Sequence, residues 1–130
     1  MKVIIHAQKG KITSDMFDRV ISSHIDTVLM VIAGVSEVVY TNMEEIIIHD
    51  GWREAEVAIE WAKKRSIAVK LVKTNPFFRK GASTVRDQNM CKRAGALADL
   101  ILFWDGKDKG CLKLKTIAEN YFLKVKEVMV

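Results

Sequence analysis

Hydrophobic residues gather in five short runs along the chain, with stretches of helical spacing between them. The runs cover residues 3–5, 46–48, 69–72, 100–104 and 125–130. The first, second and fourth are nearly unbroken and rich in β-branched or aromatic residues, which is typical of strands buried on both faces. The third is interrupted by Lys70 alone. The fifth contains Lys126 and Glu127 and follows Lys124, so we expect it at the edge of a sheet.

Helices are predicted between the later runs. After the second run, apolar residues recur on one helical face at Trp52, Ala55, Ala58, Ile59 and Ala62. This helix should end at the basic residues 63–65, which suit the negative end of the helix dipole. Another helix is marked by Cys111, Leu114, Ile117, Ala118 and Tyr121. A weaker one spans about residues 83–94, with Val85 and Cys91 facing inward.

The segment between the first two runs allows more than one interpretation. Thr13 or Ser14 is placed to cap a helix, and apolar residues keep helical spacing well beyond it. Gly34 interrupts this pattern, and residues 27–32 equally fit an extended run. We therefore expect a helix to about Gly34 and leave residues 35–40 open.

The alternation of strands and helices indicates an α/β domain of the Rossmann-like kind. We expect three layers, right-handed crossovers and a mostly parallel sheet of about five strands. The length of 130 residues suits a single domain over residues 1–130.

Composition narrows the class of protein. Cys91 and Cys111 form neither a CxxC nor a Cys/His pattern, so we expect no metal site, no disulfide framework and no cofactor. The apolar start is too short for a signal peptide, and the longest apolar stretch, residues 28–35, is far below the about 20 residues of a membrane span. We therefore expect a cytoplasmic protein. The net charge of +5 fits a nucleic-acid or phosphorylated partner, or simply a solvated basic surface.

Candidate site residues are sought beyond the carboxyl ends of the strands, where α/β sheets bind ligands and helix N-termini favour phosphate. The first strand leads from His6 to Lys9 and Gly10, which could meet an anion or form a plain solvated loop. If the first two strands are neighbours, His6 would lie beside His49. A metal pair there would need a third ligand that the sequence does not place nearby.

The second strand is followed by Gly51 and Arg53. Glycine permits a tight turn or a close approach of the backbone to a ligand, and a guanidinium can bind phosphate or carboxylate. Asp50, Glu54 and Glu56 place negative charge where a phosphate would bind. Asp50 could equally be the N-cap of the next helix, and the two glutamates could be acids of its first turn.

The third strand leads into a loop that contains Phe77 and Phe78 beside the basic residues 79–80. The aromatic rings could stack a base, although one or two buried phenylalanines that pin the loop are the commoner explanation. On the following helix, Arg86 and Asn89 share a face and could converge on one ligand.

The fourth strand ends at Trp104, and Asp105, Gly106, Lys109 and Gly110 follow it before a helix. Glycines, lysines and a helix start together form a candidate anion cradle. Asp105 could bind ribose hydroxyls or act as a base. As a turn, however, Asp-Gly needs no ligand at all.

This part of the chain resembles a known family. Residues 98–110, followed by Ile117-Ala118, are similar to the pattern AD-x-hydrophobic-FWDG-x-SxG…A of the YspA-like branch of the SLOG superfamily, named after the Smf/DprA and LOG proteins. Residues 86–90 look like its RNxxM element, with Asp87 in the second position. Residues 49–56, with Trp61-Ala62 after them, look like HGGARGAD…WA.

The resemblance covers roughly residues 46–128. It implies a Rossmann-like fold and a pocket for a nucleotide or a nucleotide-derived ligand such as an ADP-ribose relative. In place of the family's first-strand GSR motif, this chain has Ala7-Gln8-Lys9. In the second motif, Asp50 and Glu54 replace two glycines, and Glu56 replaces the final aspartate. Gly51 and Arg53 of that motif are retained. LOG enzymes cleave N-glycosidic bonds of nucleoside monophosphates, but their glycine-rich motif and catalytic glutamate are not reproduced.

Three functions remain compatible with these residues. A binding module would sense or sequester a nucleotide-like ligand. The ligand's phosphate would bind to Arg53, Arg86 and Lys109. Its ribose would bind to Asp105, and its base would stack on Trp104 or Phe77. A phosphoribohydrolase or N-glycosidase would use Glu54, Glu56 or Asp105 as the catalytic carboxylate. A binder of single-stranded nucleic acid would lose affinity steeply with salt, and the scattered lysines favour it least. A homodimer through residues 17–39 is expected because that segment is richer in apolar residues than one buried face requires.

Overall fold

The computed structural model describes residues 2–10, 12–32, 43–78 and 80–130, with the backbone alone for residues 24–32. Two predictions fall wholly or partly outside these ranges. The open segment 35–40 is one. The expected dimer surface, residues 17–39, is the other.

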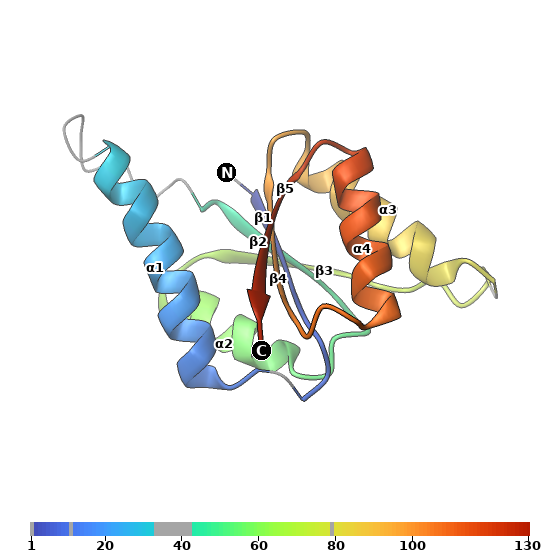
Figure 1. Ribbon diagram of the computed structural model, residues 1–130, viewed down its shortest axis with the longest axis horizontal. Helices are drawn as coiled ribbons and strands as arrows, with labels where there is room; N and C mark the ends of the chain where they lie inside the picture. The colour runs from blue at the N-terminus through green and yellow to red at the C-terminus, as the bar shows by residue number, and fades with distance from the viewer. Residues whose placement is uncertain (1, 11, 33–42, 79) are drawn as a thin grey trace.

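The described chain forms one sheet of five parallel strands in the order β3-β2-β1-β4-β5 (Figure 1). The strands are β1 (Lys2–Ala7), β2 (Glu45–His49), β3 (Ala68–Val72), β4 (Asp99–Trp104) and β5 (Lys124–Met129). The fold class is therefore confirmed: an α/β, Rossmann-like domain built on a parallel sheet.

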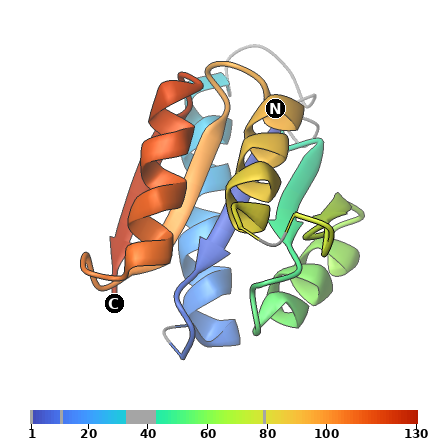
Figure 2. The same cartoon turned by 90° about the vertical axis from the view of Figure 1, so that its right-hand side faces the viewer.

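Helices cover both faces of the sheet and complete the three layers. They are α1 (Ser14–Ile32), α2 (Ala55–Lys64), α3 (Ala82–Ala94) and α4 (Lys109–Asn120). The first two pack on one face and the last two on the other, as Figures 1 and 2 show from two directions. None of the helices in the described ranges is long and apolar enough to cross a membrane.

Each face of the sheet carries its own hydrophobic core because side chains alternate along a strand. In β2, Ile46 and Ile48 enter the core beneath α1 and α2, and Ile47 enters the core beneath α3 and α4. All six residues of β4 are buried, as a central strand requires.

The two ends of the strand order explain which strands are polar. The prediction that the fifth run forms an edge strand is confirmed, since β5 pairs with β4 alone. The other edge is β3, where Lys70 is exposed and Leu71 is 39% exposed. The position of β3 in the sheet depends on the crossovers of the whole chain. Its own composition therefore did not show that it is an edge strand.

The helix ends largely follow their predicted signals. The hydroxyl of Thr13 accepts a hydrogen bond from the Met16 amide at 3.2 Å, so Thr13 is the capping residue. In α3, Cys91 is buried as predicted, whereas Val85 is only partly buried. The prediction for α2 was wrong at its start. Trp52 lies in a turn before the helix, with its amide donating to the His49 carbonyl at 3.2 Å.

The strand order places a topological switch point between β1 and β4. The chain leaves β1 towards α1 on one face and leaves β4 towards α4 on the opposite face. The loops that follow these strands therefore diverge at the carboxyl edge of the sheet, which is where open α/β sheets bind ligands.

Candidate functional site

His6 and His49 lie side by side at the carboxyl ends of β1 and β2. Their rings stack with centroids 4.5 Å apart and an interplanar angle of 29°. Alternation along the strands turns both side chains towards α3 and α4, the same side as Ile4 and Ile47. The expectation that the two histidines would be neighbours is confirmed. In the described residues no group of three or more potential ligands could hold a metal ion.

Both imidazoles are neutral at physiological pH. Burial and the Arg86 guanidinium lower the pKa of His6 to about 4, and burial, His6 and Arg86 together lower that of His49 to about 3. The Nδ1 atom of His49 accepts a hydrogen bond from the Gly51 amide at 2.9 Å. A neutral ring that accepts at Nδ1 carries its proton on Nε2, so the tautomer of His49 is fixed by the turn that follows its strand.

Gly51 allows α3 to reach the strand ends. A Cβ atom at this position would lie 2.7 Å from Nη1 of Arg86 and 3.0 Å from the ring of His49. Arg86 occupies that space and donates from Nη1 to the Thr74 hydroxyl at 3.3 Å and from Nε to Asp87 at 3.2 Å. The glycine is therefore needed because the guanidinium packs on its backbone.

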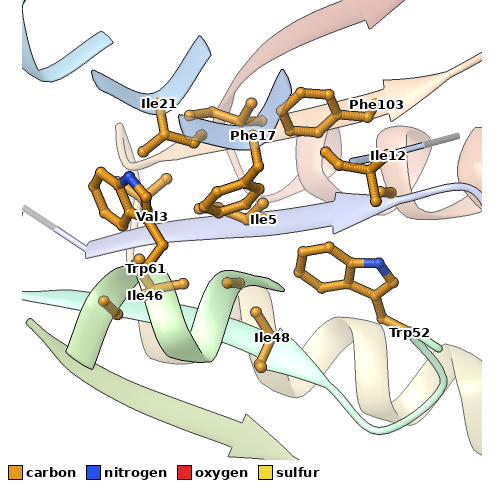
Figure 3. Close-up of a cluster of buried hydrophobic side chains, with 14 of the residues drawn as sticks. Val3, Ile5, Ile12, Phe17, Ile21, Ile46, Ile48, Trp52, Trp61 and Phe103 are labelled. Atoms are coloured by element: carbon orange, nitrogen blue, oxygen red, sulfur yellow. The ribbon is translucent and has the colours of Figure 1, made fainter. Parts of the chain in front are cut away.

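Three buried polar atoms at this end of the sheet have no hydrogen-bond partner among the described residues: His6 Nδ1, Trp52 Nε1 and Glu54 Oε2. Trp52 is 3% exposed and meets His6 edge-on, with ring centroids 6.2 Å apart. In Figure 3 its six-membered ring points into the apolar cluster and its nitrogen lies on the opposite side. We call His6, His49, Trp52, Glu54 and Arg86 the β1–β2 polar cluster.

The indole N–H groups of the other two tryptophans, unlike that of Trp52, each have a hydrogen-bond partner. The indole of Trp61 donates to Asp18 at 2.9 Å, and that of Trp104 donates to Glu127 at 3.1 Å. Buried polar groups are nearly always paired in folded proteins, so an unpaired indole N–H at the mouth of a Rossmann-like sheet indicates a place where a ligand or water binds.

Carboxylates accept hydrogen bonds from backbone amides in the loops after β1 and β3. Glu54 accepts a hydrogen bond from the Gly10 amide at 2.7 Å through Oε1. Asp50 accepts from the Thr74 amide at 2.8 Å and from the Thr74 hydroxyl at 2.6 Å. These contacts lower the pKa of Asp50, against the effect of its partial burial. Asp50 thus ties β2 to the loop after β3.

The loop after β4 is satisfied in the same way. Asp105 accepts from the amides of Lys107 at 2.7 Å and Asp108 at 3.1 Å, and Asp108 accepts from the Cys111 amide at 2.9 Å. Gln8 bridges the switch point: its side-chain oxygen accepts from the Asp105 amide at 3.0 Å, and its nitrogen donates to the Asp105 carboxylate at 3.3 Å. The interpretation of Asp105 as a turn residue is thereby supported by its contacts.

The structure brings some of the predicted site residues together. Gly51 packs against Arg86, and both Arg86 and Glu54 lie close enough to His6 to affect its pKa. Asp105 and Gly106 lie across the switch point, next to Gln8. Lys9, Arg53 and Glu56 are exposed around the rim. Gly110 lies in the first turn of α4, beside the Asp108 carboxylate.

Other predicted residues lie apart from the cluster. Trp104 is 3% exposed, so both faces of its ring are covered in the core beneath α3 and α4. Asn89 is exposed in a groove along β3, together with Arg93. Lys109 lines a groove between α3 and α4 with Thr84 and Lys113.

Two interpretations of loop residues were wrong. Asp50 does not cap α2; Glu54 holds the N-cap position, and its side chain makes no capping hydrogen bond. The phenylalanines of the loop after β3 do not pin it, because Phe77 is 90% exposed and Phe78 is 47% exposed. Arg79, between Phe78 and Lys80, lies outside the described residues.

The sequence did not single out Trp52 or Thr74 as site residues. Trp52 continues the apolar spacing of α2 backwards, so it was assigned to the helix face. The turn signal of Asp50-Gly51 immediately before it could have separated it from the helix. Thr74 carries no local signal, since its role depends on Asp50 and Arg86 from other elements.

The fold and the site define this chain as a Rossmann-like α/β protein with a polar cluster at the carboxyl ends of β1 and β2. Comparison with family models, with curated proteins and with solved structures finds no match.

Proposed function

We propose that this protein binds a nucleotide or a nucleotide-derived ligand, such as an ADP-ribose relative, at the carboxyl ends of its strands. It would act as a sensor or a sequestering protein. The observation that carries the proposal is the unpaired indole of Trp52, which is buried with its ring centroid 6.2 Å from that of His6, another residue with an unpaired polar atom. Leaving such groups without partners costs about 1–3 kcal/mol each, so a ligand that pairs them gains that energy on binding.

The surroundings of the cluster support a ligand of this kind. Lys9 and Arg53 are exposed at the rim, where they can meet the negative charge of a phosphorylated ligand. The cluster lies at the carboxyl edge of the sheet, beside the β1–β4 switch point at which open α/β sheets bind ligands. The motif resemblance to the YspA-like branch of the SLOG superfamily also supports a nucleotide-like ligand. As part of this proposal, we place the chain in that branch as a divergent member.

One observation favours a second candidate, cleavage of the N-glycosidic bond of a nucleotide. Glu54 has a buried carboxylate oxygen without a partner, and its other oxygen is held by the Gly10 amide at 2.7 Å. A carboxylate fixed in this way can stabilise an oxocarbenium-like transition state or activate water. An enzyme would release free base from a nucleotide, and Glu54→Gln would abolish the release, whereas a binding module releases none.

Thermal denaturation with a panel of ligands tests the proposed function. The panel contains AMP, ADP, ADP-ribose, NAD and cyclic nucleotides. A ligand at about 100 times its dissociation constant adds about 2.7 kcal/mol to the unfolding free energy, which shifts the melting temperature measurably. Trp52→Phe should lose the shift because it removes the N–H and keeps a ring. Trp61→Phe, the matched control, should retain it. A flat response of the wild type across the panel would refute the proposal.

A further inference from the structure

We infer that the buried part of the site takes the hydroxyl groups of a sugar, such as the cis-diol of a ribose, and that the ligand's phosphate stays outside it. This inference rests on the proposed function and adds which end of the ligand enters the β1–β2 polar cluster.

Carboxylates already accept hydrogen bonds from several backbone amides at this edge of the sheet. Rossmann-like sites usually hold phosphate on free N–H groups where loops meet helix N-termini. Here the amides of Gly10, Thr74 and Cys111 already donate to carboxylates at 2.7, 2.8 and 2.9 Å. The Asp105 carboxylate likewise takes the amides of the next loop residues. At these loop amides a phosphate would have to displace one of the carboxylates, whereas the first turns of α2 and α3 carry no side-chain cap.

The buried atoms that remain unpaired suit hydroxyl groups better than a phosphate. Glu54 Oε2 only accepts hydrogen bonds, and a phosphate dianion has no hydrogen to donate, so the two would repel. Trp52 Nε1 only donates. A hydroxyl group donates and accepts at once, so the hydroxyls of a sugar suit a donor such as Trp52 Nε1 and an acceptor such as Glu54 Oε2 equally. The neutral ring of His6 offers a further partner without adding charge.

The cations near the cluster differ in how they are paired and exposed. Arg86, the cation within the cluster, is committed to Asp87 and Thr74. Lys9 and Arg53 lie at the exposed rim. The charges therefore favour an orientation with the sugar inside and the phosphate outside.

The test is calorimetric titration of the whole protein with ADP-ribose, adenosine, 2′,3′-dideoxyadenosine and inorganic pyrophosphate. We expect adenosine to bind and removal of its two hydroxyls to weaken binding by about tenfold or more, as for a hydrogen bond to a charged group. Pyrophosphate should not compete with adenosine.

Two neighbouring glutamates provide matched variants. Glu54→Gln should weaken adenosine and ADP-ribose by about tenfold and leave dideoxyadenosine unchanged. Glu56→Gln, on an exposed side chain, should match the wild type. Trp52→Phe provides a second variant if Glu54→Gln does not fold, and it should also weaken adenosine.

Equal affinity for adenosine and its dideoxy analogue, or competition by pyrophosphate, would overturn this inference and leave the proposed function standing. If none of the nucleosides and nucleotides binds, both fail together.

Discussion

The imidazole rings of His6 and His49 stack at 4.5 Å between centroids, on adjacent strands at the carboxyl edge of the sheet. Two cationic rings so close, beside Arg86, would repel strongly. Burial, with Arg86 as a further cause, depresses the pKa values of His6 and His49 to about 4 and about 3, so both rings are neutral at neutral pH. This relationship makes stability depend on pH.

Stability should fall as the pH is lowered from about 6.5 towards 4. The unfolded histidines bind protons near pH 6.5, whereas the folded ones bind them only near pH 4 and pH 3, so the unfolded state holds more protons in this window. The stability is therefore full above the unfolded pKa and is lost as the pH falls towards the folded values. Each histidine contributes a slope of up to about 1.4 kcal/mol per pH unit. Urea unfolding at several pH values measures this slope.

The variant His49→Asn isolates the contribution of one histidine to the pH dependence of stability. Its amide oxygen can still accept the Gly51 N–H, and one titrating ring is gone. The slope between pH 5 and 6.5 should drop by about half, since carboxylates such as Asp50 titrate mainly below this range. An unchanged slope would mean that the histidines are not the source.

Replacing Gly51 by alanine should destabilise the protein by about 1–3 kcal/mol, because the new Cβ would crowd both Arg86 and His49. Gly110→Ala is the comparison. Its Cβ would lie 3.3 Å from one Asp108 oxygen in a helix, where alanine is the better residue, so the change should stay below about 1 kcal/mol. Chemical denaturation of both variants measures the difference, and equal effects would contradict the close approach at Gly51.

Arg86→Ala should cost about 3 kcal/mol because it leaves the buried carboxylate of Asp87 without its guanidinium partner. Burial already raises the pKa of Asp87, so the additional change Asp87→Asn should recover part of the loss. Arg93→Ala removes a similar pair with Glu45 on the surface, where the arginine is 40% exposed, and should cost below about 1 kcal/mol. Equal costs for the two arginines, from urea unfolding, would argue against a structural role of the Arg86–Asp87 pair.

Cys91 and Cys111 should not react with thiol reagents while the protein is folded. Both are buried, and burial raises the pKa of each thiol to about 12, so very little of the reactive thiolate forms at pH 8. Spectrophotometric labelling should report no fast thiol in the native protein and two after unfolding. Rapid labelling of either one in native buffer would show that the helix covering it opens readily.

Most of the fold could be predicted because its signals are local. Unbroken runs such as Ile46–Ile48 identify buried strands by themselves, and the charges of Lys124 and Lys126 identify an edge strand. The start of α2 could not be placed, because Trp52 extends the apolar spacing into a turn. The strand order depends on the crossovers, so β3 gave no sign of lying at an edge.

The candidate site was only partly predictable because it is made by contacts between distant segments. Gly51, Glu54 and Arg86 were recognised as strand-end and helix residues, but their meeting place depends on how α3 crosses the sheet. Asp50 looked like a helix cap, and its actual partner is Thr74 in another loop. The free atom of Trp52 is a property of the packed structure and leaves no trace in the sequence.

The most direct test follows the three indole N–H signals in a proton–nitrogen correlation spectrum during titration with ADP-ribose. Trp61 and Trp104 donate to Asp18 and Glu127 and serve as internal references, whereas Trp52 has no partner among the described residues. We expect the Trp52 signal to move as the ligand is added and the other two to stay in place. A Trp52 signal that stays unchanged at saturating ligand would contradict the site described here.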